Sequence, residues 1–397
     1  MTGLSIDEAF EGIDFANTTV GDVRDPYPDY VTARREHPVQ EIEHFGHRSF
    51  GVFRYADVAA VLDDNETFSS SIYAEAMGMV MGPTILQLDG REHLQRRGLI
   101  AHAFRRKAMA AWEATTIEPT ATALVEQFAG RGRADLVREL AYQLPIRIIA
   151  SILGIPSQDY GRFARLSIDM ISMAVDFDRG MAASRGLGEY LGEIVTRRRA
   201  EPRGDLISEL ATVEIEGQAL SDEEVLGFLR LLLPAGAETT FRLLGNLLFG
   251  LLSTGQLSEV NEDRGRMAPA IEEALRWESP VQFISRITTH DVTIGGVELP
   301  SGSPLTTYLG SANRDEAAYG DPDRYDLHRE GPPHQAFGGG HHFCLGAHLA
   351  RIETTVAVNA LLNRVRDLRI DPEAEDVHVR GYAFRSPVSL PVVFDPA

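Results

Sequence analysis

The sequence predicts a mainly α-helical fold with a small β region, folded as a single large domain over residues 1–397. Long amphipathic patterns with helical periodicity occupy residues 116–200 and 221–253, whereas alternating strand patterns are short and lie near residues 39–53 and 281–300. No Ser- and Pro-rich linker, low-complexity tract or internal repeat divides the chain. These observations predict one extensive hydrophobic core.

Composition limits the classes of function. The formal net charge of −20 argues against nucleic acid or an anionic membrane as a general partner. The N-terminus lacks a basic and apolar signal sequence, and charge interrupts every long apolar run before about 18 residues. The single cysteine excludes an internal disulfide and suits a reducing compartment. We therefore expect a soluble, cytoplasmic protein.

The N-terminal region predicts a small sheet followed by an apolar loop. Residues 39–41 and 49–53 predict two neighbouring strands. Residues 69–88 have no regular periodicity although they are apolar, which predicts an irregular segment that covers a buried space. Met79 and Met81 of this segment are candidate substrate contacts, and ordinary core packing is the alternative.

A long helix is predicted over residues 221–253. Ser221 and Glu224 form a capping box at its start, and at 1.5 Å per residue the helix spans roughly 50 Å. Pro234 and Gly236 lie in its middle, where proline removes a backbone hydrogen bond and costs about 3 kcal/mol in a regular helix. The sequence therefore predicts a kinked helix that crosses the molecule.

The C-terminal half predicts further strands. Residues 281–287 alternate in the manner of a strand, and residues 292–300 predict a hairpin. Residues 389–394 predict a last strand, which we expect at a sheet edge because Pro391 lacks a ladder donor.

The only cysteine lies in a glycine-rich loop at residues 337–346. A helix predicted after Cys344 places the sulfur beside unpaired backbone N–H groups, which lower a thiol pKa and favour the thiolate that binds metals. Glycines at 338, 340 and 346 allow a sharp turn or close packing against a planar ligand. The loop therefore predicts a haem site with Cys344 as the metal ligand.

Two other interpretations of the loop remain open. Cys344 could be a buried, inert thiol. A zinc ion could also be held by the cysteine and nearby histidines, namely His342, Cys344 and His348 with His334 or His341. Zinc is disfavoured because structural zinc sites usually use two close ligand pairs and need no glycine-rich surface.

The pattern Phe337-Gly338-x-Gly340-x-His342-x-Cys344-x-Gly346 resembles the haem-binding loop of the cytochrome P450 family. Other motifs of the family occur in the same order along nearly the whole chain. The segment Ala235-Gly236-Ala237-Glu238-Thr239-Thr240 is similar to the family's oxygen-activation motif. The remaining similar segments lie near residues 89–97, 273–276, 286 and 311–325.

This resemblance implies a cytochrome P450 fold that encloses haem b between the kinked helix 221–253 and the cysteine loop 337–346. It implies a haem-thiolate monooxygenase, an oxidoreductase that uses O2 and two electrons to hydroxylate or otherwise oxidise a hydrophobic small molecule. Because the chain has no flavin or ferredoxin segment, we expect a separate ferredoxin-type donor with its NAD(P)H-dependent reductase. The alternative is a haem-thiolate sensor or recruitment protein without turnover, and Glu238 with Thr239 favours the enzyme.

The resemblance also implies roles for particular residues. The loop residues that contact haem are Phe337, Gly338, Gly340, His342, Cys344 and Gly346, and the other propionate partners are His93, Arg97 and Arg286. The residues that deliver protons are Glu238 and Thr239. The structural residues are Glu273, Arg276 and Arg324, and the mobile lid is formed by residues 157–175 and 180–199. The candidate substrate contacts are Met79, Met81, Leu232, Ala235, Val281, Phe283, Ile284 and Phe384.

A basic cluster stands out in this acidic chain. Arg96, Arg105, Arg106 and Lys107 lie within twelve residues. In the resembling fold, the helix that carries His93 and Arg97 faces the cysteine side of the haem. We expect the cluster to dock an acidic electron donor, and a solvated basic segment is the alternative.

Overall fold

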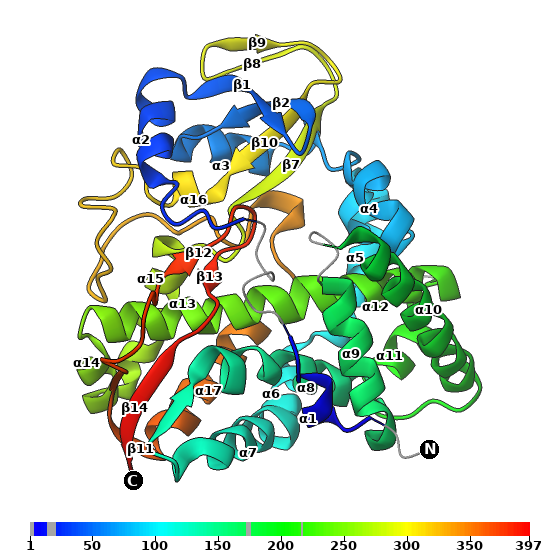
Figure 1. Cartoon of the computed structure of the whole chain (residues 1–397). Helices are drawn as coiled ribbons and strands as arrows, with labels where there is room; N and C mark the ends of the chain where they lie inside the picture. The colour runs from blue at the N-terminus through cyan, green and yellow to red at the C-terminus, as the bar shows by residue number, and fades with distance from the viewer. Residues whose placement is uncertain (1–3, 14–20, 172–175, 216) are drawn as a thin grey trace.

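A long, broken helix crosses the middle of the molecule, between a mainly β region and a larger helical region (Figure 1). The structure is a computed structural model that describes residues 4–13, 21–171, 176–215 and 217–397. The predicted mainly α fold with a small β region is confirmed. No helix within these ranges is long and apolar enough to cross a membrane.

The α-helices form most of the described chain. They are α1 Ile6–Ala9, α2 Tyr27–Glu36, α3 Tyr55–Asp63, α4 Tyr73–Met81, α5 Gly90–Ala103, α6 Arg106–Trp112, α7 Glu118–Ala129, α8 Gln143–Ile152, α9 Tyr160–Ile171, α10 Phe177–Ala200, α11 Leu206–Thr212, α12 Asp222–Leu232, α13 Thr239–Ser253, α14 Leu257–Glu262, α15 Met267–Trp277, α16 Leu309–Ala312 and α17 Ala347–Leu362. Short 3₁₀ segments are η2 Ile85–Gln87, η5 Ser157–Asp159, η8 Arg264–Arg266 and η9 Gly340–His342. Turns of π-helix are η3 Glu113–Ile117, η4 Val137–Ala141 and η7 Leu233–Glu238.

The largest sheet has the strand order β1-β2-β10-β7-β3. Its strands are β1 Val39–His44, β2 His47–Val52, β10 Pro304–Tyr308, β7 Phe283–Thr288 and β3 Phe68–Ser69. The predicted N-terminal pair is confirmed, because β1 and β2 are antiparallel with Val39 opposite Val52. Strand β10 runs parallel to β2 and antiparallel to β7. The sheet therefore joins the N-terminal region to residues 283–308.

The other strands form small sheets. They are β11 Val365–Ile370, β14 Pro391–Pro396 and β4 Arg133–Asp135 in one sheet, and the pairs β12 Val379–Arg380 with β13 Ser386–Pro387, β5 Glu214–Ile215 with β6 Gln218–Ala219, and β8 Val292–Ile294 with β9 Val297–Leu299. The predicted hairpin at 292–300 is confirmed. The predicted edge position of the last strand is wrong, because β14 lies between β11 and β4. Pro391 is tolerated there because it is the first residue of the strand.

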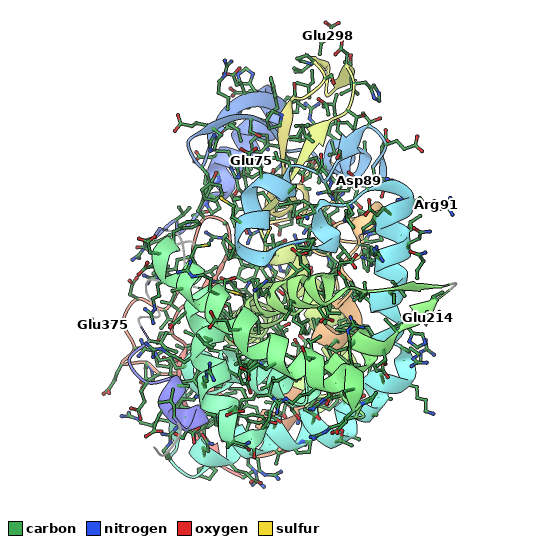
Figure 2. All side chains as sticks on the ribbon, turned by 90° about the vertical axis from the view of Figure 1, so that its right-hand side faces the viewer. Glu75, Asp89, Arg91, Glu214, Glu298 and Glu375 are labelled. Carbon is green, nitrogen blue, oxygen red and sulfur yellow. The ribbon has the colours of Figure 1, made fainter. Side chains whose placement is uncertain are left out.

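Two other predicted segments differ from the structure. Residues 69–88 are not irregular throughout, because α4 forms over Tyr73–Met81 and ends at Gly82, which has a φ of 77°. The predicted helix pair at 157–175 and 180–199 corresponds to α9 and α10, with residues 172–175 outside the described chain. Helix α10 packs against α9, α12 and α4. Figure 2 shows the molecule from the side on which α4, α5 and α10 lie in Figure 1.

The break in the long helix is a π-turn. The capping box of Ser221 and Glu224 opens α12, and η7 separates it from α13. Pro234 cannot donate a backbone hydrogen bond, and wider i→i+5 hydrogen bonding is a common way for a helix to accommodate such a break. The structure therefore has a π-helical segment at the place where the sequence predicts a kink.

Candidate cofactor and active site

The cysteine loop is held by its own backbone. The Cys344 N–H donates to the Phe337 carbonyl oxygen at 2.9 Å, which closes the loop just before α17. Gly338 and Gly340 have positive φ values of 69° and 55°. A Cβ atom at Gly340 would lie 2.4 Å from the Leu62 carbonyl oxygen, so only glycine fits there. The predicted need for glycine is confirmed at these two positions.

The Cys344 thiol lies between opposing influences. Burial raises its pKa, and this effect outweighs the backbone N–H groups of Gly346 and Ala347 and the guanidinium groups of Arg97 and Arg351. The predicted helix start and cations are present, but the expectation that they alone give a thiolate is wrong. A coordinated metal ion deprotonates a thiol outright, so a metal ligand at this position needs the charge of the metal itself.

The zinc alternative does not fit the geometry. Within the described ranges, no three or more His, Cys, Asp or Glu side chains gather in a way that could hold a metal ion. His334 instead lies 3.1 Å from a carboxylate oxygen of Glu272, and His341 and His348 are exposed. The loop thus offers one metal ligand, Cys344, as an axial position on haem iron requires.

A cluster of cationic and imidazole groups gathers beside the loop. His93 of α5 is fully buried, and its ring centroid lies 4.1 Å from that of His342. Burial lowers the pKa of both imidazoles to about 4, and the positive charge of Arg286 acts in the same direction. Arg286 is 3% exposed and donates to the Ser285 carbonyl oxygen at 2.8 Å. The structure therefore brings the predicted propionate partners together.

This cluster contains buried polar atoms without partners. Neither ring nitrogen of His93 has a hydrogen-bond partner, although both are buried. With its pKa lowered to about 4, the His93 ring is neutral and offers one N–H donor and one acceptor nitrogen. Arg97 adds a cation, whose Nη2 donates to the Phe343 carbonyl oxygen at 2.5 Å. Buried polar groups are normally paired, so the unpaired nitrogens beside these cations suit a polar ligand with acidic groups. The propionates of haem, bound with its iron at Cys344, fit this arrangement.

Two residues of this cluster were missed by the sequence analysis. Asp89, labelled in Figure 2, lies at the start of α5. It accepts hydrogen bonds from the Ser69 hydroxyl and the Ser70 N–H, and one of its carboxylate oxygens lies 3.4 Å from Nε2 of His342. The position of Asp89 just before a helix indicates an N-cap residue, but it does not indicate the contacts with Ser69, Ser70 and His342. The Tyr73 hydroxyl accepts the Ser285 N–H at 2.8 Å and lies beside Arg286, and no sequence signal indicated this contact.

The π-turn carries the predicted oxygen-activation residues. The Thr239 hydroxyl donates to the Ala235 carbonyl oxygen at 2.6 Å, as predicted. Ala235 is exposed and Thr239 is half-buried although both lie at mid-length of the long helix, so other side chains do not fill the space beside them. A small ligand therefore has room at this turn.

Glu238 faces a different partner. It is buried, and its carboxylate pairs with Arg242 at 2.7 Å. Arg242 is fully buried and also donates to the Ser386 hydroxyl at 3.1 Å. Burial raises the pKa of Glu238, and Arg242 opposes that shift. The acid predicted to deliver protons is thus held by an arginine one helical turn further along.

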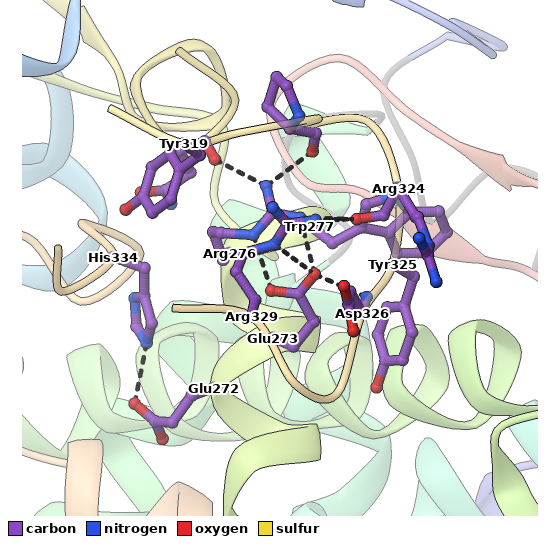
Figure 3. A network of polar contacts seen from close by, with 12 residues as sticks. Glu272, Glu273, Arg276, Trp277, Tyr319, Arg324, Tyr325, Asp326, Arg329 and His334 are labelled. Atoms are coloured by element: carbon purple, nitrogen blue, oxygen red, sulfur yellow. Dashed lines mark hydrogen bonds and ion pairs between the residues drawn. The ribbon is translucent and has the colours of Figure 1, made fainter. Parts of the chain in front are cut away.

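A buried ion network ties α15 to the segment that contains Pro322 and Arg329 (Figure 3). Arg276 pairs with Glu273 through two hydrogen bonds of 2.7 and 2.8 Å, as predicted. The prediction of Arg324 as the third member is wrong, because its side chain is exposed and only its carbonyl oxygen accepts from Arg276 at 3.1 Å. The third member is Arg329, whose Nε donates to Glu273 at 3.0 Å.

A second ion network joins α15 to α17. Glu272 accepts from Arg351 at 2.6 and 2.8 Å and contacts His334 at 3.1 Å. Burial would raise the pKa of Glu272, yet the Arg351 and His334 contacts outweigh it and lower the pKa to about 2. The Arg351 guanidinium also lies 4.6 Å from the centroid of the Phe337 ring. The first residue of the cysteine loop is thereby tied to the helix that follows it.

The candidate substrate contacts fall into different environments. Met79 of α4 is 70% exposed, whereas Met81 is 1% exposed and belongs to the main core. Phe283 packs within an aromatic cluster that includes Tyr308 and Tyr382. The packing of Met81 and Phe283 therefore supports structural roles. The candidates that keep partial or full exposure are Leu232, Ala235, Val281, Ile284 and Phe384.

The basic cluster is smaller than predicted. Arg96 pairs with Glu224 at 2.7 Å, and Arg105 lies 3.6 Å from Glu209. Two of the four basic residues, Arg96 and Arg105, therefore have acidic partners within the chain. Arg106 and Lys107 are exposed, and no ion pair forms for either within the described chain.

Comparisons with known proteins agree with this geometry. The family model described as cytochrome P450 matches residues 267–376. Nocardicin C N-oxygenase from Nocardia uniformis subsp. tsuyamanensis is 37% identical over 93% of this chain and 96% of its own. Mycinamicin IV hydroxylase/epoxidase from Micromonospora griseorubida is 35% identical over 92% and 94%. The crystal structure of a Bacillus megaterium cytochrome P450 in complex with testosterone matches with a TM-score of 0.84 and 33% identity, over 93% of this chain and 99% of that one.

Proposed function

The chain belongs to the cytochrome P450 family and is a haem-thiolate monooxygenase, and on this premise we propose that Cys344 is the iron ligand and that a hydrophobic small molecule is the substrate. One observation carries the site assignment. The glycine-rich loop contains the one cysteine, and its His342 lies beside His93, whose two ring nitrogens are buried and unpaired. Bound haem, proposed as haem b, supplies the O2 activation that a thiolate ligand favours.

The loop and the cation cluster bind and orient the cofactor in this proposal. His93, Arg97, Arg286 and His342 donate to its propionates, which replaces the missing acceptors of the cluster. Phe337, Gly338, Gly340 and Gly346 form a surface on which a planar ring packs closely.

In this proposal, Thr239 and Glu238 of the π-turn region take part in proton transfer. The Thr239 hydroxyl donates its hydrogen to the Ala235 carbonyl oxygen, so its own oxygen can accept a hydrogen bond from a ligand or water in the open space beside it. Glu238 is the nearest acid in sequence, and burial raises its pKa toward the range in which a carboxyl group exchanges protons. It reaches that role by exchanging its ion pair with Arg242 for a contact with water or with Thr239.

Electrons come from separate redox proteins, and a ferredoxin with its NAD(P)H-dependent reductase is the proposed pair. Arg106 and Lys107, exposed at the start of α6, are the proposed docking charges. A cytoplasmic location for the whole system stays a prediction.

The substrate proposal rests on the apolar segment of α4 and on the relatives. One relative is named for mycinamicin IV, and one solved structure holds testosterone. Spectral titration of the haem protein with terpenoids, steroids, fatty acids and aromatics is the test, followed by turnover of each binder with ferredoxin and reductase. We expect a shift of the Soret band and an oxygenated product for at least one class. Binders that never yield a product would favour the sensor alternative.

A further inference from the structure

Arg230 of α12 lies where three helices meet. Its Nε donates to the Ser184 carbonyl oxygen of α10 at 3.2 Å. Its Nη2 fills the place of a side chain at Gly188, where a Cβ atom would lie 1.8 Å away. Its Nη1 lies 3.8 Å from the Cβ position of Gly82, at the end of α4. The guanidinium therefore sits between α12, α10 and α4.

The charge of Arg230 is not matched by the surrounding chain. Within the described residues, no carboxylate lies within ion-pair distance of it, and its side-chain hydrogen bond goes to a backbone carbonyl. Burial lowers the pKa of the half-buried Arg230, and Glu223 acts against that shift without cancelling it. A partly desolvated cation of this kind is stabilised when an anion joins it.

Its position connects this cation to the proposed active site. Arg230 precedes Ala235 by five residues, which corresponds to about 7.5 Å along a helix axis. Ala235 is exposed at the π-turn, and α4 and α10 cover the neighbouring part of α12. Five residues also turn a helix by about 140°, so a small molecule that reaches both Ala235 and the guanidinium crosses α12 obliquely beneath α4 and α10.

We propose that Arg230 binds a carboxylate at the far end of the substrate, which makes the substrate a hydrophobic carboxylic acid. This inference rests on the proposed function and narrows its substrate class. Arginine presents a planar set of N–H donors that matches a carboxylate with two parallel hydrogen bonds. Gly188 leaves the space in which the guanidinium lies flat, and a larger residue there would displace it.

The test compares acids with neutral partners of the same shape. Binding to the haem protein is measured by isothermal titration calorimetry for laurate and dodecanol, 4-butylbenzoate and 4-butylbenzyl alcohol, and cholate and its methyl ester. The variants are Arg230→Met, which keeps the apolar stem, and Arg230→Lys, which keeps the charge. Arg185→Met is the matched control, because Arg185 is an exposed arginine on α10.

The wild type is expected to bind at least one acid about tenfold or more tightly than its neutral partner, as one charge-assisted pair allows. Arg230→Met should remove that preference while the neutral partner binds as before, Arg230→Lys should retain part of it, and Arg185→Met should change nothing. The inference is overturned if no acid binds more tightly than its neutral partner, or if Arg230→Met weakens both equally. Failure of the proposed function would appear separately, as neutral ligands that bind but are never oxygenated.

Discussion

The ion network of α15 and the cation cluster around His93 use similar residues in opposite ways. Around Glu273, the carboxylate accepts from both Arg276 and Arg329 (Figure 3). Around His93, both imidazole nitrogens remain unpaired. The carboxylate of the first region has its partners within the chain, whereas the second region has polar atoms that a ligand would pair. Unpaired buried polar atoms therefore support the proposed cofactor site better than the number of charges does.

The largest expected effect comes from removing the one metal ligand. Cys344→Ser should abolish the red-shifted Soret band that a thiolate gives to the reduced carbon monoxide complex, because a serine hydroxyl is a far poorer ligand than a thiolate. Absorption spectra of the reduced, CO-treated variant measure this. A surviving band would mean that the cluster beside the loop serves another ligand.

Removing Glu273 from the ion network of α15 should lower the free energy of unfolding. Glu273→Gln leaves buried Arg276 and Arg329 without a counter-charge, and loss of one partner of a buried pair costs about 3–5 kcal/mol. Denaturant unfolding of the holoprotein measures the change. Glu272→Gln is the control, because the Glu272 side chain is 44% exposed and its pairs should contribute only up to about 1 kcal/mol. Equal losses for the two variants would contradict the comparison.

One acid of α17 is an exception among the paired carboxylates near the loop. Glu353 is buried, its Oε2 has no hydrogen-bond partner, and burial raises its pKa to about 8. Between the unfolded pKa near 4.5 and a folded pKa near 8, the native state keeps a proton that the unfolded chain loses. The free energy of unfolding should therefore fall by up to a few kcal/mol as pH rises through this window.

Glu353→Gln removes the titratable carboxyl group and so tests whether Glu353 causes this pH dependence. The variant should gain stability relative to the wild type as pH rises from 5 to 8, and the two should converge at lower pH. Urea unfolding across the pH series measures the difference. A constant difference at every pH would show that Glu353 does not keep its proton in the folded protein.

A smaller effect is expected at the π-turn. Thr239→Ala should keep haem and substrate binding but lower the product formed per electron several-fold, with peroxide as the other product, because a hydrogen-bond partner beside the ligand space is lost. Product, peroxide and NAD(P)H consumption are measured together. Thr240→Ala is the neighbouring control, because Thr240 is buried on α13. Unchanged product per electron in Thr239→Ala would remove its proposed role.

The smallest effect concerns the exposed charges of α6. Arg106→Glu with Lys107→Glu should slow the first electron transfer a few-fold at low ionic strength, because attraction between exposed charges is screened by salt. Stopped-flow reduction by a ferredoxin measures the rate across a salt series. Arg185→Glu is the control for charge reversal at another exposed site. Identical rates for the double variant and the wild type would exclude this docking surface.

Sequence analysis predicted the parts of the site that depend on neighbours along the chain. The capping box and the Thr239 to Ala235 hydrogen bond are set by residues within four positions, and the positive φ values of Gly338 and Gly340 are local to the cysteine loop. Arg242, which pairs with Glu238, is also local, and its spacing of four residues was a usable signal.

The errors came from contacts between distant segments. The choice of Arg329 over Arg324 depends on the path of the loop after Tyr319, which the motif alone does not specify. The central position of β14 depends on pairing with β4, more than 250 residues earlier. The contact of Asp89 with His342 joins residues that are 253 positions apart. Local patterns therefore predicted which residues matter better than which residues meet.

The π-turn in the long helix separates two halves that have different neighbours. Such a turn holds one more residue than an α-turn, so it offsets the angular phase of the following helix by about 100°. On one side of it, α12 packs against α4 and α10, whereas on the other α13 packs against α15 and α17. Asn246 fixes the second half by donating to the Glu278 and Arg385 carbonyl oxygens. The turn thus sets the rotation of one half of the helix relative to the other, where an unbroken α-helix would keep a single phase along its whole length.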